Sequence, residues 1–239
     1  MLIFVILVLV IFVTVIASHR EKFTLGTVQK YIINLESRPD RMQVTIPLLK
    51  NFGYTRITRF DATSYNPDLL KLVHKDHIGP IIAEKRTKHH ELSKGAVGCY
   101  LSHISIYEKL LQTTDSDMFM IFEDDVLPSD TIQVLEKEVA MAPKDWDILL
   151  IGGIYSGKDT FPIVKVGSFY QLHAYIIKKN AVEKILNKCY PIMYQIDSFL
   201  SDMSENNELN VYGLNKMDWG INHQVSRTDI QTPILTELR

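Results

Sequence analysis

The sequence predicts an α/β fold with a mainly parallel central sheet, preceded by an N-terminal hydrophobic helix. Short apolar runs alternate with segments whose apolar residues recur at helical spacing, which is typical of this class. The 239 residues suffice for one such domain. One apolar run, residues 118–122, ends in the carboxylates Glu123, Asp124 and Asp125. Because open α/β sheets bind ligands beyond the carboxyl ends of their strands, we expect a site there.

The N-terminus is the most apolar part of the chain. Residues 2–17 are apolar except for one threonine. At ~1.5 Å per residue, a helix of this length spans roughly 24 Å, slightly less than a hydrocarbon core of ~30 Å. We expect residues 1–18 to form a single-pass membrane anchor or the apolar part of a cleaved signal peptide, with a linker over 19–29. The following charges are too few to fix its orientation.

The expected elements follow in order along one domain, residues 30–239. Runs rich in β-branched and aromatic residues predict strands, and apolar residues at helical spacing predict helices. Ser93 is a candidate cap for one of these helices. In the first half we predict a strand over 30–35, a helix over 42–51, a strand over 55–60, a short helix over 67–73, a charged loop over 75–94, a helix over 95–111 and a strand over 117–122.

The second half continues the alternation without a break that indicates another domain. Ser129 or Asp130 is expected to cap a helix that runs to residue 142. The later elements are strands over 147–151, 164–166 and 174–177, helices over 180–188 and 196–203, and a strand over 210–214.

The overall charge argues against a nucleic-acid-binding function. The 26 Lys and Arg against 28 Asp and Glu give a net charge of −2, whereas a nucleic-acid groove needs a basic excess. We therefore expect no nucleic-acid partner.

Cys99 and Cys189 are the only cysteines, and two so far apart specify neither a disulfide framework nor a metal site. We expect both to be buried free thiols.

The three adjacent carboxylates at 123–125 need a positive charge nearby to offset their mutual repulsion. Neighbouring carboxylates repel one another, and partial burial increases the cost. A hard divalent cation with oxygen ligands offsets this repulsion. Strand alternation would put Glu123 and Asp125 on one face and Asp124 on the other. On spacing alone, a metal site and a solvated acidic turn are equally good interpretations.

Several separate segments, collinear over residues 30–231, match one known pattern. They are Ile32-Ile33-Asn34-Leu35 with Arg38, Asp40 and Arg41, then GAVGCYLSH over 95–103, FEDDV over 122–126, WDILLIGG over 146–153, AYII over 174–177, IDSFL over 196–200, and Gln224 with Thr228-Asp229-Ile230. Together these segments resemble glycosyltransferase family 25, the group that contains lipooligosaccharide and collagen galactosyltransferases.

The resemblance implies a fold, a reaction and a cofactor. It implies a GT-A type fold that binds a nucleotide sugar, and a UDP-sugar donor carrying galactose or glucose. It also implies Mn²⁺ or Mg²⁺, and transfer with inversion to a hydroxyl of a glycan or glycoprotein acceptor. The alternative is a catalytically inactive family member that binds a glycan or a partner.

The resemblance also suggests roles for the acids. Asp125 would hold the metal, with Glu123 or Asp124 in support, and Glu123 alternatively contacts the ribose of the donor. His223 would complete the metal shell, and a surface histidine is the other interpretation. Asp197 is the candidate base for the acceptor hydroxyl, and capping of the helix over 198–203 is its alternative.

Four further residues are expected to contact the donor. Arg38 and Arg41 follow the first strand, where guanidinium groups suit diphosphate or uracil; pairing with Asp40 is the alternative. Ser102 and His103 follow the glycines of the 95–103 segment, and the resemblance places them at the donor. The structural alternative is a pair of satisfied core residues.

Overall fold

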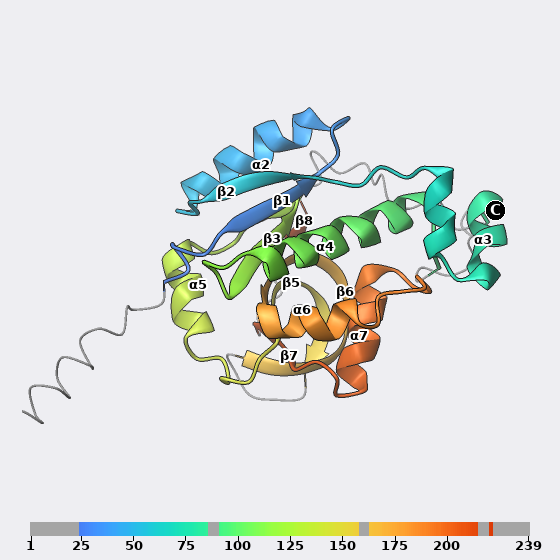
Figure 1. The fold of residues 1–239 in the computed structure, drawn as a ribbon. Helices are drawn as coiled ribbons and strands as arrows, with labels where there is room; N and C mark the ends of the chain where they lie inside the picture. Colours follow the sequence, from blue (N-terminus) through green and yellow to red (C-terminus); the bar gives the residue numbers. More distant parts are fainter. Residues whose placement is uncertain (1–23, 86–90, 158–162, 215–219, 222–239) are drawn as a thin grey trace, which may run out of the picture.

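One mixed sheet lies between two groups of helices, which confirms the predicted α/β class (Figure 1). The computed structural model describes residues 24–85, 91–157, 163–214 and 220–221. The expected anchor over residues 1–18 lies outside the described residues. Among the helices that are described, none is long and apolar enough to cross a membrane.

The central sheet has the strand order β2-β1-β3-β6-β5-β7 in the described part of the chain. β1 pairs parallel with both β2 and β3, so the carboxyl ends of these three strands meet at one edge. A separate antiparallel pair, β4 with β8, follows the acidic residues. The strands are β1 (Lys30–Asn34), β2 (Ile57–Asp61), β3 (Met118–Glu123), β4 (Val126–Leu127), β5 (Ile148–Gly157), β6 (Ile163–Lys178), β7 (Val211–Leu214) and β8 (Gly220–Ile221).

The expectation of a mainly parallel sheet is wrong, because β6 runs antiparallel to β3, β5 and β7. β5 ends at Gly157 and β6 begins at Ile163, and a connection this short cannot make the crossover that parallel strands need. The two strands predicted over 164–166 and 174–177 are one long strand. Its beginning pairs with β7 and its end with β3, so β5, β6 and β7 curl around one another in Figure 1.

Side-chain alternation along the strands creates a core on each face of the sheet. In β3, Phe119 and Ile121 belong to one core, whereas Met120 and Phe122 belong to the other. A strand buried on both faces is continuously apolar, which is why this run was recognisable from sequence. The first core lies under α4 (Lys94–Gln112), α6 (Lys179–Leu186) and α7 (Ile196–Glu205), and the second under α2 (Pro39–Asn51) and α5 (Ile132–Val139).

Two local predictions need correction. The segment predicted as a loop over 75–94 contains α3 (Lys75–Ile82), which follows the 3₁₀ helix η1 (Pro67–Leu72). Its N-cap is His74, whose ring accepts from the Asp76 amide, so the usual capping residues were missing from the sequence. The N-cap of α5 is Thr131, without a side-chain hydrogen bond, rather than Ser129 or Asp130. Ser93 does cap α4 by accepting from the Ala96 amide.

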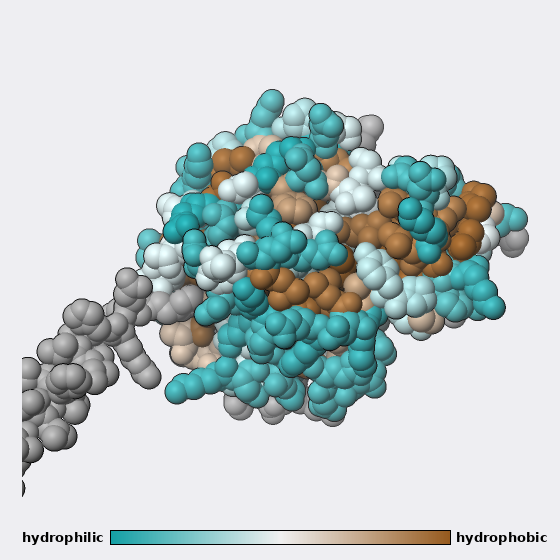
Figure 2. Space-filling model, in the orientation of Figure 1, coloured by the Kyte–Doolittle hydropathy of each residue, from teal (hydrophilic) through white to brown (hydrophobic). Residues whose placement is uncertain are grey.

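The edge where β1 and β3 end is also where α4 begins. Ile33 lies opposite Glu123 in the parallel register, so Asn34 and the acidic residues leave the sheet together. Figure 2 shows hydrophilic residues over α6 and an apolar area toward α3, where Ile82 is exposed. The site described below lies in the hollow between α4, α7 and the ends of the two strands.

Candidate functional site

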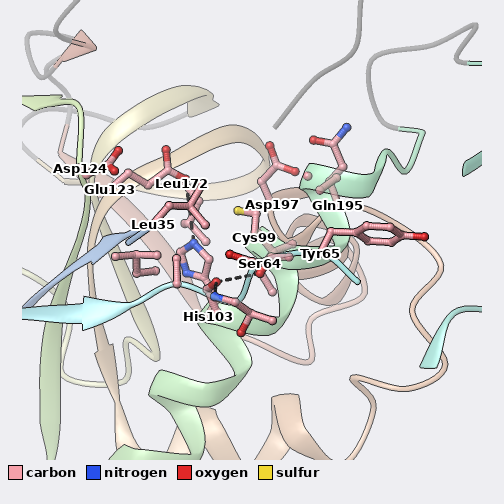
Figure 3. Close-up of a pocket in the computed structure, with 18 of the residues that line it drawn as sticks. Leu35, Ser64, Tyr65, Cys99, His103, Glu123, Asp124, Leu172, Gln195 and Asp197 are labelled. Carbon is pink, nitrogen blue, oxygen red and sulfur yellow. Dashed lines mark hydrogen bonds and ion pairs between the residues drawn. The ribbon is translucent and has the colours of Figure 1, made fainter. Parts of the chain in front are cut away.

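A pocket of about 640 Å³ lies at the carboxyl ends of β1 and β3 (Figure 3). Its volume is in the range of pockets that bind small molecules. Seven of the residues predicted from sequence line it, and they come from four separate parts of the chain. They are Arg41, Ser102, His103, Glu123, Asp124, Asp125 and Asp197.

Asp124 is held by bonds to β1 and α2. Its carboxylate accepts from Asn34 Nδ2 at 2.7 Å and from Arg41 Nη1 at 2.6 Å. Its backbone oxygen accepts from Thr45 Oγ1. These buried, partly charged bonds fix the turn after β3, because each satisfies a group that water cannot reach. Asp124 therefore anchors the turn in the structure.

Arg41 and Arg38 have different surroundings. Arg41 is buried and lies 2.6 Å from an Asp124 oxygen and 3.6 Å from an Asp125 oxygen, so it supplies the positive charge that the acids need. Arg38 pairs with Asp40 through two bonds of 3.1 and 2.9 Å and is absent from the residues that line the pocket. The structure thus shows the pairing of Arg38 with Asp40, and contact of Arg38 with a donor stays a prediction.

Glu123 and Asp125 also line the pocket, and they have no comparably close partner in the part of the chain that the structure describes. Burial raises the pKa of Glu123 above its ordinary value, and Asp124 and Asp197 raise it further against the lowering effect of His173 and Arg41. Burial also raises the pKa of Asp125, and the nearby Glu123 carboxylate adds to the effect.

The Oδ1 atom of Asp125 is buried and has no hydrogen-bond partner among the described residues. Two carboxylates that repel each other, one with a free buried oxygen, are a fitting donor set for a divalent cation. Glu123 and Asp125 are therefore the residues that would hold it.

The N-terminal half of α4 forms another wall of the pocket. A Cβ at Gly98 would overlap the carbonyl oxygen of Thr63, so this glycine allows two backbones to pack closely. Ser102 Oγ donates to the Gly98 oxygen at 2.7 Å and accepts from the Thr63 amide at 2.8 Å. Close packing, rather than contact with a ligand, accounts for Gly98, and Ser102 joins the loop after β2 to this helix.

His103 is fully buried and its two nitrogens have different neighbours. Nδ1 lies 2.7 Å from the Tyr175 hydroxyl, which lies 2.8 Å from the Tyr107 hydroxyl. Nε2 lies 3.9 Å from a Glu123 oxygen and has no hydrogen-bond partner in the described ranges. Burial lowers the pKa of His103 to about 4, so the ring is neutral at neutral pH. The Nε2 side of the ring therefore faces Glu123.

Asp197 lies in the first turn of α7, on the other side of the pocket from Asp124 in Figure 3. The N-cap of α7 is Gln195, so Asp197, for which capping was the alternative role, is not the N-cap residue. One Asp197 oxygen accepts from the Ser198 amide at 2.7 Å and the other from the Gln171 amide at 3.1 Å. Gln171 has φ of 64°, a conformation that costs a non-glycine residue energy and often occurs at functional sites. These two amides fix the direction of the carboxylate.

Some predicted site residues lie outside the described part of the chain, and some residues near the site were not predicted from sequence. His223, the predicted metal ligand, lies outside the described residues, as do Gln224 and Asp229. Sequence reasoning missed Asn34, although it ends a strand at the binding edge, where polar residues are informative. Residues 63–65, Gln171 and Gln195 line the pocket from loops and strand bends that carry no sequence signal.

Cys99 is not the buried core thiol that was expected. It is only half-buried and lines the pocket, whereas Cys189 is buried, and both are free. Burial raises the pKa of the Cys99 thiol well above its ordinary value, and Glu123 and Asp197 raise it further. The expectation of free thiols is therefore confirmed, but the expectation of burial in the core holds only for Cys189.

Comparison with known proteins points to one family. The family model described as glycosyltransferase family 25 (LPS biosynthesis protein) matches residues 27–200. A relative in Mus musculus, named inactive glycosyltransferase 25 family member 3, is 27% identical over 54% of this chain and 22% of its own length. Procollagen galactosyltransferase 1 of Danio rerio is 24% identical over 79% of this chain and 33% of its own length. The chain thus spans less than half the length of these relatives.

Two solved structures show a weak similarity to this chain. The galactosyltransferase LgtC in complex with donor and acceptor sugar analogs has a TM-score of 0.41 and 11% identity, over 77% of this chain and 72% of that one. Apo UDP-glucose pyrophosphorylase has a TM-score of 0.42 and 11% identity, over 79% of this chain and 90% of that one. Both scores lie below 0.5, so the family match and the residues of the pocket carry the argument that follows.

Proposed function

The chain belongs to glycosyltransferase family 25, and from this premise we propose that it is a metal-dependent hexosyltransferase with a GT-A type fold. It moves galactose or glucose from a UDP-sugar to a hydroxyl of a glycan or glycoprotein, with inversion at the anomeric carbon. The observation that carries the proposal is the convergence of two acid sites on one pocket. Glu123 and Asp125 come from the end of β3, and Asp197 comes from the start of α7.

The acidic end of β3 is suited to the diphosphate side of the donor. Asp125 and Glu123 would hold Mn²⁺ or Mg²⁺, which supplies Lewis-acid stabilisation of the charge on the departing diphosphate when it is bound. Asp124 and Arg41 keep the turn in position through their buried pair. Arg38 pairs with Asp40 and is not among the residues that line the pocket, so its contact with the donor is retained as a candidate on sequence grounds alone. His223 is retained as a candidate ligand on sequence grounds alone.

Asp197 is proposed to act on the acceptor. In an inverting transfer the acceptor oxygen attacks C1 of the hexose, the bond from C1 to the diphosphate oxygen breaks, and the acceptor proton passes to a base. Asp197 lies across the pocket from the acids of β3, and its carboxylate is oriented by the amides of Gln171 and Ser198. Ser102 and His103 line the same pocket from α4 and are proposed to shape the donor site.

Replacing Asp197 tests the assignment of the base. Asp197→Asn keeps the size of the side chain and removes its basicity, so turnover should fall by about 10²–10⁴-fold while donor binding changes little. Asp202→Asn is the matched control, because Asp202 is exposed on the same helix and should leave turnover unchanged. Transfer and donor binding are measured separately, by UDP release and by calorimetric titration with UDP. Unchanged turnover in Asp197→Asn contradicts the assignment.

A second function is supported by the names of the relatives. Three of the matched relatives are named inactive or probable inactive family members. On this alternative the pocket binds a nucleotide sugar or a glycan without turnover. Tight UDP binding together with no UDP release from any donor, with or without acceptors, supports the binding protein. Metal-dependent release from one donor supports the transferase.

We further propose that residues 1–18 anchor the chain to a membrane. The support is the apolar composition of residues 2–17, whose length is close to that of a membrane span. Extraction of membranes with alkaline carbonate tests the proposal. The full chain should stay in the membrane fraction, and its release into the supernatant contradicts an anchor.

A further inference from the structure

Three side chains beside the acidic turn form a group of a different chemical kind. Cys99 and His103 lie four residues apart on α4, so both project from one face of that helix. Glu123 approaches them from the end of β3. One ligand atom from each, the cysteine sulfur, a histidine nitrogen and a glutamate oxygen, lies within 4.8 Å of the other two. Figure 3 shows all three in the same pocket.

The histidine of this group is prepared to accept a cation. His103 is 0% exposed, and its Nε2 has no hydrogen-bond partner among the described residues while it faces Glu123 at 3.9 Å. In the tautomer that carries its proton on Nδ1, the ring donates to the Tyr175 hydroxyl and leaves a lone pair on Nε2. Histidine ligands of metals usually donate their other N–H in this manner, which fixes the ring.

We propose that Cys99, His103 and Glu123 form a second cation site, selective for a thiophilic divalent metal such as Zn²⁺. Thiolate, imidazole and carboxylate are typical zinc ligands, and three protein ligands leave one position open toward the pocket. Bonds of about 2.0–2.3 Å require ligand atoms to lie about 3.3–3.8 Å apart. The atoms here lie within 4.8 Å of one another, so the widest separation in the group must shorten by at most about 1–1.5 Å when a metal binds. The cysteine loses its proton to solvent when the metal binds.

This site differs in preference from the one at Asp125. The hard oxygen ligands of Asp125 and Glu123 suit Mn²⁺ or Mg²⁺, whereas a cysteine ligand favours softer metals. Because Glu123 belongs to both groups, occupation of the second site takes that carboxylate away from Asp125. The inference concerns metal binding alone and does not depend on the proposed transferase activity.

Cobalt binding tests the second site without any donor sugar. The full chain is purified in detergent, stripped of metal with a chelator and titrated with Co²⁺ as a visible substitute for Zn²⁺. A bound thiolate gives a sulfur-to-cobalt charge-transfer absorption in the near ultraviolet. We expect this absorption in the wild-type chain, and we expect Zn²⁺ to displace it. Cys99→Ser should abolish it, whereas the matched control Cys189→Ser should keep it.

A second variant and a folding check make the outcome decisive. His103→Gln should weaken Co²⁺ binding by about 10-fold or more, since it removes one of three ligands. Thermal melts establish that each variant is folded before its spectrum is compared. No charge-transfer absorption in the wild-type chain overturns the inference. So does absorption that survives Cys99→Ser or disappears in Cys189→Ser, and either result leaves the proposed transferase intact.

Discussion

Replacing Asp125 should stabilise the metal-free protein while it removes metal binding. In the folded chain, burial and the neighbouring Glu123 carboxylate raise the pKa of Asp125. A carboxyl whose pKa is higher in the folded than in the unfolded state favours the folded state when it is protonated. Its contribution is present at acidic pH and is lost as the pH rises through the two pKa values. Asp125→Asn removes this loss because the amide carries no charge.

The size of the effect follows from the surroundings of the side chain. The Asp125 side chain is 14% exposed, and its Oδ1 has no hydrogen-bond partner within the described residues. An unsatisfied buried polar group costs about 1–3 kcal/mol, and more when it is charged. The neutral amide of Asn removes the charge-dependent part of this cost. Part of that cost is offset by Arg41, 3.6 Å away, so we expect Asp125→Asn to raise the free energy of unfolding by about 1–2 kcal/mol at pH 8. For a chain of this size the melting temperature should rise by about 2–8 °C.

Thermal unfolding of the full chain in chelator, followed by circular dichroism from pH 4 to pH 8, measures the effect. The wild-type free energy of unfolding should decline between about pH 4 and pH 7, and the decline should be smaller in Asp125→Asn. Asp202→Asn, an exposed residue, should follow the wild-type curve. Added Mn²⁺ should stabilise the wild-type chain but not Asp125→Asn.

Two results refute the reasoning about the acid pair. One is an Asp125→Asn chain that melts at a lower temperature than the wild type at pH 8 in chelator. The other is a melting difference between the two chains that is the same at pH 4 and pH 8. Either would mean that the Asp125 carboxylate is satisfied in the folded chain without a metal.

Three further predictions concern the support of the site. Arg41→Gln should lower the free energy of unfolding by about 3–5 kcal/mol, because it leaves the buried Asp124 carboxylate without its charge partner. Denaturant unfolding measures this free energy, and a loss below about 1 kcal/mol contradicts the prediction. Gly98→Ala should destabilise the folded protein by about 1–3 kcal/mol, because the added Cβ clashes with backbone. Gly79→Ala has open space around it and should not lower the stability. Equal melting temperatures for the two variants contradict the packing argument. Ser102→Ala should cost about 1–3 kcal/mol in thermal melts, since it removes both hydrogen bonds of a buried hydroxyl, and an unchanged melt contradicts that role.

The sequence was sufficient to locate β1, β2, β3, β5 and β7 and the acids at the end of β3. The apolar run of β3 is buried on both faces, so its pattern was unambiguous, and its carboxyl end located the pocket. It was not sufficient for the direction of β6. Strand pairing depends on the length of the preceding connection, and two short apolar runs concealed one long, curled strand.

The partners of the site residues were the least predictable feature. Arg38 and Arg41 are only three residues apart in sequence, yet Arg41 is buried against Asp124 whereas Arg38 pairs with Asp40. This difference depends on the direction in which α2 leaves β1. The proximity of Cys99 to Glu123 likewise depends on the packing of α4 against the sheet. Periodicity places residues on a face of an element, but it does not set the distance between two elements.

We propose that the pocket at the end of β3 transfers a hexose from a nucleotide sugar with the help of Asp125. Release of UDP by the full chain, measured with UDP-galactose and UDP-glucose in Mn²⁺ and in chelator, tests it most directly. We predict release from one of these donors in Mn²⁺, none in chelator, and a loss of about 10²-fold or more in Asp125→Asn. Equal release with and without metal, or full release by Asp125→Asn, would contradict the account.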